Sequence, residues 1–179
     1  MDLIKVLFRV ISKYEKEFLE SNGKMSDKLW FIKKDKVQES LDITISDEMD
    51  LILGVGLRAA RLKYSMTVFA IEVAMRKMKS KEEALYTLEH FDTERPNAYP
   101  ESMRTRFLGF LVFDNKKEGV QLFCHDVKQI DEKVSFEGEL YAIPCEEVFG
   151  MLDLIIATYI QGYHFNSTNS GPAFNVSLN

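Results

Sequence analysis

The sequence has few of the residues that mark a specialised scaffold. Its 179 residues include two cysteines, Cys124 and Cys145, which excludes a disulfide-stabilised secreted fold and predicts two free thiols. It holds only four prolines and nine glycines, too few for a fibrous or low-complexity chain. No run of about 18 apolar residues occurs, so the sequence predicts no membrane-spanning helix. These absences together predict a cytoplasmic protein.

The sequence also lacks the motifs of common metal and cofactor sites. It has three histidines, and none combines with another histidine or a cysteine at a zinc-binding spacing. Cys124 and His125 are neighbours in a predicted strand, so their side chains are expected on opposite faces. Gly54 and Gly56 lack the third glycine of a dinucleotide-binding turn, and we interpret them as a site of close helix packing. We therefore predict no metal, no cofactor and no catalytic residue.

Charge of one sign is in excess. The chain has 23 basic and 28 acidic side chains, a formal net charge of −5 at pH 7. This net charge argues against a nucleic-acid partner and against an anionic membrane. One concentrated basic run, Arg76 to Lys81, and the nearby Arg58 and Arg61 could still contact phosphates. We interpret the run as cations at the end of a helix, where they complement its dipole.

The composition is that of a globular protein, with 46% hydrophobic and 28% charged residues. The length fits a single domain over residues 1–179. A helix is predicted from Asp2 to Ser21, where Asn22 and Gly23 end it. Its apolar stripe consists of Leu3, Leu7, Val10, Ile11, Tyr14 and Phe18. Short strands are predicted over Leu29–Ile32 and Val37–Ile45.

The remainder of the first half has helical periodicity. A helix is predicted from about Ser46 through Leu62, the pattern continues over Lys63–Lys79, and a capping box at Ser80 opens a short helix to Phe91. The period then changes to that of strands. These strands are expected over Phe107–Phe113, Val120–Val127 and Val134–Ile143, followed by a helix over Cys145–Phe165 and an edge strand over Phe174–Leu178.

These elements predict an α+β fold. In it, a helical N-terminal half packs on an antiparallel sheet, which consists of a three-stranded meander plus short edge strands. A long apolar C-terminal helix follows the sheet. No linker or repeat divides the chain, which supports the single domain.

The apolar C-terminal helix suggests an interface. Its hydrophobic residues cover more of the circumference than one core-facing stripe requires. We therefore predict a homodimer in which this helix lies at the subunit contact, while burial in the core of one chain remains the alternative. The predicted interface residues are Phe149, Leu152, Ile156, Tyr159 and Tyr163.

The leading hypothesis for function is a non-enzymatic protein-binding module of the small acidic inhibitor, immunity-like or phage-accessory type. The net acidity would complement another protein with a basic surface. The alternative is a small hydrolase or transferase that uses Cys145, at a predicted helix start, or an acidic pocket. A third interpretation is nucleic-acid binding through Arg76 to Lys81.

Overall fold

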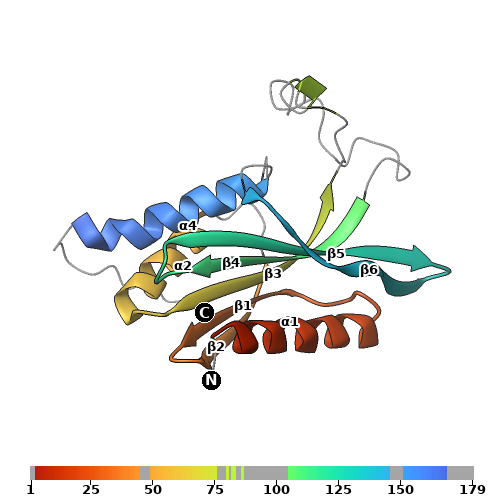
Figure 1. Cartoon of the computed structure of the whole chain (residues 1–179), viewed down its shortest axis with the longest axis horizontal. Coiled ribbons are helices and arrows are strands. Elements are labelled where there is room, and N and C mark those ends of the chain that lie inside the picture. Colours follow the sequence, from red (N-terminus) through yellow and green to blue (C-terminus); the bar gives the residue numbers. More distant parts are fainter. Residues whose placement is uncertain are drawn as a thin grey trace.

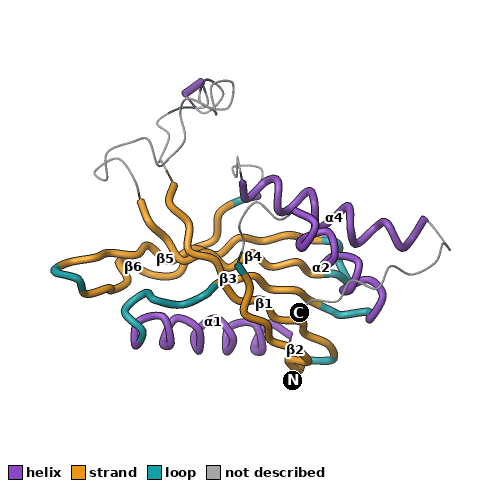
Figure 2. Tube along the Cα trace, turned by 180° about the vertical axis from the view of Figure 1, so that it is seen from behind, coloured by secondary structure: helices purple, strands orange, loops and turns teal. Residues whose placement is uncertain are grey.

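The chain forms three layers, with a β-sheet between helices on both faces (Figure 1). Helix α1 (Leu3–Glu20) covers one face, and helices α2 (Met49–Leu62) and α4 (Met151–Thr168) cover the other. Figure 2 shows the same layers from behind. This computed structural model describes residues 3–44, 49–75, 80, 82–83, 86, 105–145 and 151–168.

The sheet has six strands in the order β2-β1-β3-β4-β5-β6, and every neighbouring pair is antiparallel. The strands are β1 (Asp27–Lys33), β2 (Lys36–Ile43), β3 (Met66–Met75), β4 (Thr105–Asp114), β5 (Gly119–Ile130) and β6 (Lys133–Ile143). The fold is therefore α+β.

The predicted arrangement within this class is wrong. In place of a helical N-terminal half beside a three-stranded meander, three of the six strands precede residue 76. The segment predicted as helix over Lys63–Lys79 contains strand β3, at the centre of the sheet between β1 and β4. Because helices cover both faces, β3 is apolar on both sides. Such a run lacks the alternation of a half-exposed strand and resembles a buried helix in sequence.

The predicted long apolar helix over Cys145–Phe165 is also wrong. The described helix α4 begins at Met151. A single stripe of α4 faces the core, and polar side chains such as Asp153 and Gln161 lie on its exposed side. The buried stripe consists of Leu152, Ile155, Ile156, Tyr159 and Gly162. This is the ordinary pattern of a helix that covers one face of a sheet.

The prediction for the first helix is confirmed. Its apolar stripe packs on the sheet, and Asn22 and Gly23 follow it with φ angles of 55° and 75°. The side chain of Asn22 then reaches strand β6: its Oδ1 accepts from the Val134 amide at 2.7 Å, and its Nδ2 donates to the Glu132 carbonyl. These bonds fix the end of α1 to the start of β6.

The predicted strands β1, β2, β4, β5 and β6 are confirmed within a few residues. Two of their hairpins have two-residue turns in which both central residues have positive φ, as type I′ turns require. These residues are Lys34 and Asp35 between β1 and β2, and Asp131 and Glu132 between β5 and β6.

Several predictions fall partly or wholly outside the described residues. They concern the helix to Phe91, most of the run Arg76 to Lys81, and the edge strand Phe174–Leu178. The capping residue Ser80 is described, and its Oγ accepts from the Glu83 amide at 3.2 Å, which confirms the predicted cap. Within the described ranges, no helix has the length and apolar character that crossing a bilayer requires.

Candidate functional site

Helix α4 is held close to α2 by two glycines. A Cβ atom added to Gly56 would lie 2.3 Å from the Tyr159 carbonyl oxygen, and one added to Gly162 would lie 2.2 Å from that of Leu53. The backbones of the two helices therefore touch, which only glycine permits. Close helix packing, predicted for the two glycines of α2, is confirmed at Gly56. It fixes the position of the residues that α4 presents.

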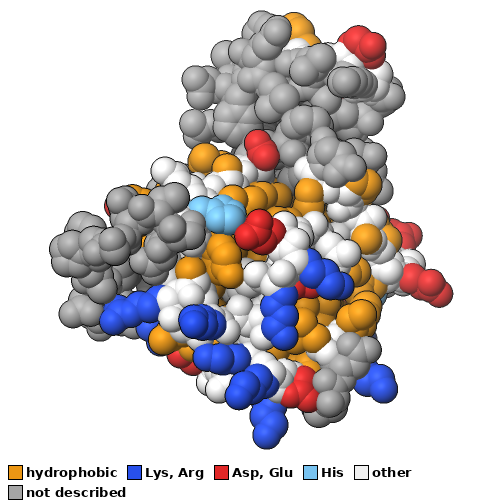
Figure 3. Space-filling view, turned by 60° about the vertical axis from the view of Figure 1, so that its left-hand side comes forward, with side chains coloured by type: hydrophobic (Ala, Val, Ile, Leu, Met, Phe, Trp, Pro, Cys, Tyr) orange, Lys and Arg blue, Asp and Glu red, His pale blue; other side chains and the backbone are white. Residues whose placement is uncertain are grey.

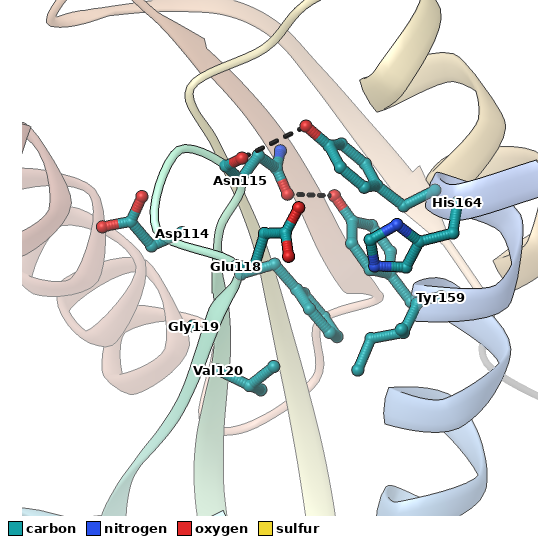
Figure 4. Close-up of a pocket in the computed structure, with 10 residues that line it drawn as sticks. Asp114, Asn115, Glu118, Gly119, Val120, Tyr159 and His164 are labelled. Atoms are coloured by element: carbon teal, nitrogen blue, oxygen red, sulfur yellow. Dashed lines mark hydrogen bonds between the residues drawn. The ribbon is translucent and has the colours of Figure 1, made fainter. Parts of the chain in front are cut away.

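A buried polar cluster joins α4 to the sheet below this crossing. The Tyr159 hydroxyl of α4 lies 2.8 Å from Asn115 Oδ1 (Figure 4) and 2.7 Å from Thr67 Oγ1. Asn115 Nδ2 donates to Thr67 Oγ1 and to the Tyr64 carbonyl, both at 3.2 Å. Asn115 follows β4, and Thr67 belongs to β3. Three separate segments thus converge on one set of hydrogen bonds.

These groups satisfy one another. Because the amide oxygen of Asn115 can only accept, the Tyr159 hydroxyl donates to it, and the Thr67 hydroxyl is then free to donate to Tyr159. The result is a closed ring of three hydrogen bonds in the interior. Burial raises the pKa of Tyr159, so its hydroxyl stays protonated near neutral pH. The ring is therefore a fixed structural joint.

A small pocket of about 110 Å³ opens beside this ring, between α4 and the β4–β5 loop. Glu118 and His164 point into it from opposite sides (Figure 4). The Tyr163 hydroxyl donates to the Asn115 carbonyl at 3.1 Å. Burial raises the pKa of this hydroxyl, and the charge of Glu118 raises it further. The pocket is lined by Phe113, Asp114, Asn115, Glu118, Gly119, Val120, Tyr159, Ile160, Tyr163 and His164.

Sequence reasoning missed this pocket. Its residues come from two segments more than 35 positions apart, and no local motif connects Glu118 with His164. The only local signal was a loop of charged residues with a glycine between two strands. Among the described residues, no group of three or more His, Cys, Asp or Glu side chains is placed to hold a metal ion.

The candidate nucleophile Cys145 lies beside the start of β5. Its Sγ donates to the Val120 carbonyl at 3.4 Å. His125 lies on the α1 side of the sheet, where it contacts Glu15 at 2.8 Å and stacks on Phe136. His164 is thirteen residues along α4 from Met151, roughly 20 Å at the rise of an α-helix.

Cys124 is in a different position from Cys145. It is fully buried among the core residues beneath α4, and burial raises the pKa of its thiol to about 12. The predicted separation of Cys124 and His125 onto opposite faces is confirmed, because His125 lies on the α1 side.

The structure places four of the five predicted interface residues. Leu152, Ile156 and Tyr159 are 3%, 9% and 2% exposed and face the core of the same chain. Tyr163 is half-buried beside that core, and Phe149 lies outside the described residues. Whether α4 contacts a second chain stays a prediction, and its exposed face presents other residues.

The exposed side of α4 carries large hydrophobic side chains beside the polar Asp153 and Gln161, and few charges. Among the 18 residues of the helix, Asp153 is the one Asp, Glu, Lys or Arg residue. The large hydrophobic side chains on this side are Met151, Leu154, Ile160 and Phe165, which are 47%, 50%, 38% and 46% exposed. Interface cores are depleted in charge in the same way.

No protein-family model, curated protein or solved structure matches this chain.

Proposed function

We propose that this chain is a non-enzymatic protein-binding module, of the small acidic inhibitor, immunity-like or phage-accessory type, and that it binds through the exposed face of α4. The observation that carries the proposal is the surface of that helix. It exposes Leu154 and Phe165 together with Met151 and Ile160, and Asp153 is its only charged residue.

A comparison with α1 supports this choice of surface. Helix α1 also exposes large side chains, Ile4 and Phe8 among them. It surrounds them with charges, and Lys13 and Lys16 each pair with a glutamate four residues later. Such charged helix faces are typical of surfaces in contact with water. The lack of charge on α4 favours a surface that a partner covers.

The partner is another protein molecule, either a second copy of this chain or a different protein. A basic partner would suit the net charge of −5. The hydrogen bond from the Cys145 thiol to the Val120 carbonyl supports the choice of a binding role over a cysteine enzyme, because it suits a structural thiol. Burial of the Tyr159 hydroxyl in a closed ring supports the same choice, because this lining residue of the pocket is engaged structurally.

Site-specific crosslinking tests the proposal. A photo-reactive amino acid at position 154, in cells that normally make the protein, should give one discrete adduct. The matched control is position 13 on α1, whose side chain is 76% exposed. An adduct at twice the chain mass of 20.7 kDa identifies a second copy, and another discrete mass identifies a different protein. No discrete adduct at 154, or the same adducts at both positions, would contradict the proposal.

A further inference from the structure

Basic side chains gather at one end of the sheet, although the chain as a whole is acidic. The turn between β1 and β2, the connection from α2 to β3, and the β4–β5 loop all lie at this end, because Ile32 pairs with Met66 and Met66 with Asp114. We call this surface the basic end. It contains Lys33, Lys34, Lys36, Arg61, Lys63, Lys116 and Lys117, with Asp35, Asp114 and Glu118 as its acidic residues.

Figure 3 looks toward this end of the molecule and shows Lys and Arg side chains gathered in a band across it. One histidine and an acidic side chain lie on one side of the band. The cations come from three segments separated by more than 20 residues each. No local run of basic residues in the sequence therefore indicates this surface.

The cations of the basic end differ from those elsewhere in the chain. Over the rest of the described surface, Lys and Arg side chains commonly pair with a carboxylate, as Lys28, Arg58 and Arg106 do. At the basic end Lys33 donates to the Leu62 carbonyl at 2.6 Å. The other six are exposed and form no ion pair within 4 Å with any described residue. Lys36 acts electrostatically on the neighbouring Asp35 carboxylate, and the charge of the other five is available to a ligand.

Part of the acidic charge at this end is already engaged. Asp114 Oδ1 accepts from the backbone amides of Lys116 and Lys117 at 3.1 and 3.2 Å, which turns the carboxylate toward the loop and leaves both lysine side chains outside. At physiological ionic strength, charges more than about 8 Å away are largely screened. The local positive surface therefore outweighs the distant acidic residues for a ligand bound at this end.

The spacing of the cations suggests the ligand. Three strand spacings separate the β1–β2 turn from the β4–β5 loop, about 14 Å at 4.7–4.9 Å per spacing. The major groove of B-DNA is about 12 Å wide, with a phosphate backbone on each side. Lys34 and Lys36 could meet one backbone and Lys116 and Lys117 the other. Six of the seven cations are lysines, which meet phosphate oxygens as point charges without base-specific geometry.

We propose that the basic end binds the phosphate backbone of duplex DNA, independently of base sequence. This binding site is separate from the exposed face of α4 and does not depend on the proposed protein partner. The net charge of −5 argued against nucleic acid, but that argument treats the charge as evenly spread. The sequence-independent contacts of proteins with DNA are of this electrostatic kind.

Fluorescence anisotropy with a 20-base-pair duplex and the full chain tests the proposal. The logarithm of the association constant should fall linearly with the logarithm of the salt concentration. The slope should be about −4 if four phosphates are neutralised. A variant with Lys34, Lys36, Lys116 and Lys117 all changed to Gln should bind at least tenfold more weakly at low salt. None of these four side chains forms a hydrogen bond or an ion pair within the described part of the fold, so the variant should stay folded.

The matched control changes Lys5, Lys13, Lys16 and Lys24 to Gln, four exposed lysines on or after α1. It alters the net charge equally and should change the affinity less than threefold. Equal losses in the two variants, or no salt-sensitive complex of the unaltered chain at 25 mM salt, would overturn the proposal. Polyglutamate that binds as tightly as the duplex at equal salt would also overturn it, in favour of an acidic protein segment.

Discussion

Gly56 of α2 and Gly162 of α4 sit at the point where the two helices cross, and each faces backbone atoms of the other helix. A side chain at either position would meet a carbonyl oxygen that cannot move aside as a flexible side chain can. Alanine at 162 gains about 1 kcal/mol of helix propensity but costs about 3 kcal/mol through the clash. We expect Gly162→Ala to lower the Tm by about 4 to 8 °C, measured by circular dichroism.

Gly119 is the control for this prediction. A Cβ atom there would find no atom within 4 Å, and its φ angle is not positive. Gly119→Ala should leave the Tm unchanged within about 1 to 2 °C, the effect of a surface substitution. If Gly162→Ala and Gly119→Ala have the same Tm, the two helices lie farther apart at their crossing than in the structure.

The hydrogen-bond ring around Tyr159 leads to a second prediction. Tyr159→Phe removes the donor to Asn115 Oδ1 and the partner of Thr67 Oγ1, both in the interior. We expect a loss of about 1 to 3 kcal/mol in the free energy of unfolding, measured by urea denaturation. Tyr163→Phe removes a bond at a half-buried position and should cost about 0.5 to 1.5 kcal/mol.

A double-mutant cycle with Thr67→Val checks that the ring acts as a unit. Residues of one hydrogen-bond network show coupling energies of about 0.5 kcal/mol or more. Additive effects of Thr67→Val and Tyr159→Phe would mean that the two hydroxyls do not share the ring.

The sequence predicted the elements whose two sides differ in polarity. Helix α1 has charged residues opposite its apolar stripe, and the β5–β6 ribbon has one exposed face, so periodicity identified both. The prediction for the residues of strand β3 was wrong because both faces of this strand are buried. Which helix covers which face depends on contacts between distant segments. That information is absent from any local window of the sequence.

The same reason explains what was missed in the candidate sites. The pocket unites Glu118 with His164, and the basic end unites Lys34 with Lys63 and Lys117. The order of the strands in the sheet creates both groups, whereas a local basic run such as Arg76 to Lys81 is visible in the sequence itself. Conversely, Leu152, Ile156 and Tyr159 were assigned to an interface because they are apolar, a property that core residues share.

The two thiols should differ in reactivity. Burial holds the pKa of Cys124 at about 12, so its reactive thiolate is scarce at pH 8, whereas Cys145 is only half-buried. Titration with a thiol reagent at pH 8 should give one reactive group per native chain and two in denaturant. Raising the pH toward 12 should speed labelling of Cys124, because its thiolate fraction then rises.

Cys145→Ser is the control for this titration and should leave no fast thiol in the native chain. A Cys145→Ser chain that still reacts at once would place Cys124 nearer to solvent than its fully buried position. If Cys145 reacts no faster than Cys124, the cysteine-enzyme alternative loses its last support.

The homodimer prediction can be tested with two residues of α4 that lie two positions apart. Ile156 is 9% exposed and faces the core, whereas Leu154 is 50% exposed on the outer face. Ile156→Asp should unfold the chain, because a carboxylate would be buried without a partner. Leu154→Asp should leave the fold intact, because its side chain stays in solvent.

If the outer face of α4 joins two copies, light scattering of the unaltered chain should give twice its 20.7 kDa. Leu154→Asp should then give a folded monomer, because it places a charge in each half of a two-fold contact. An unaltered chain that is monomeric at tens of micromolar would remove the second copy as partner and leave the exposed face of α4 to another protein.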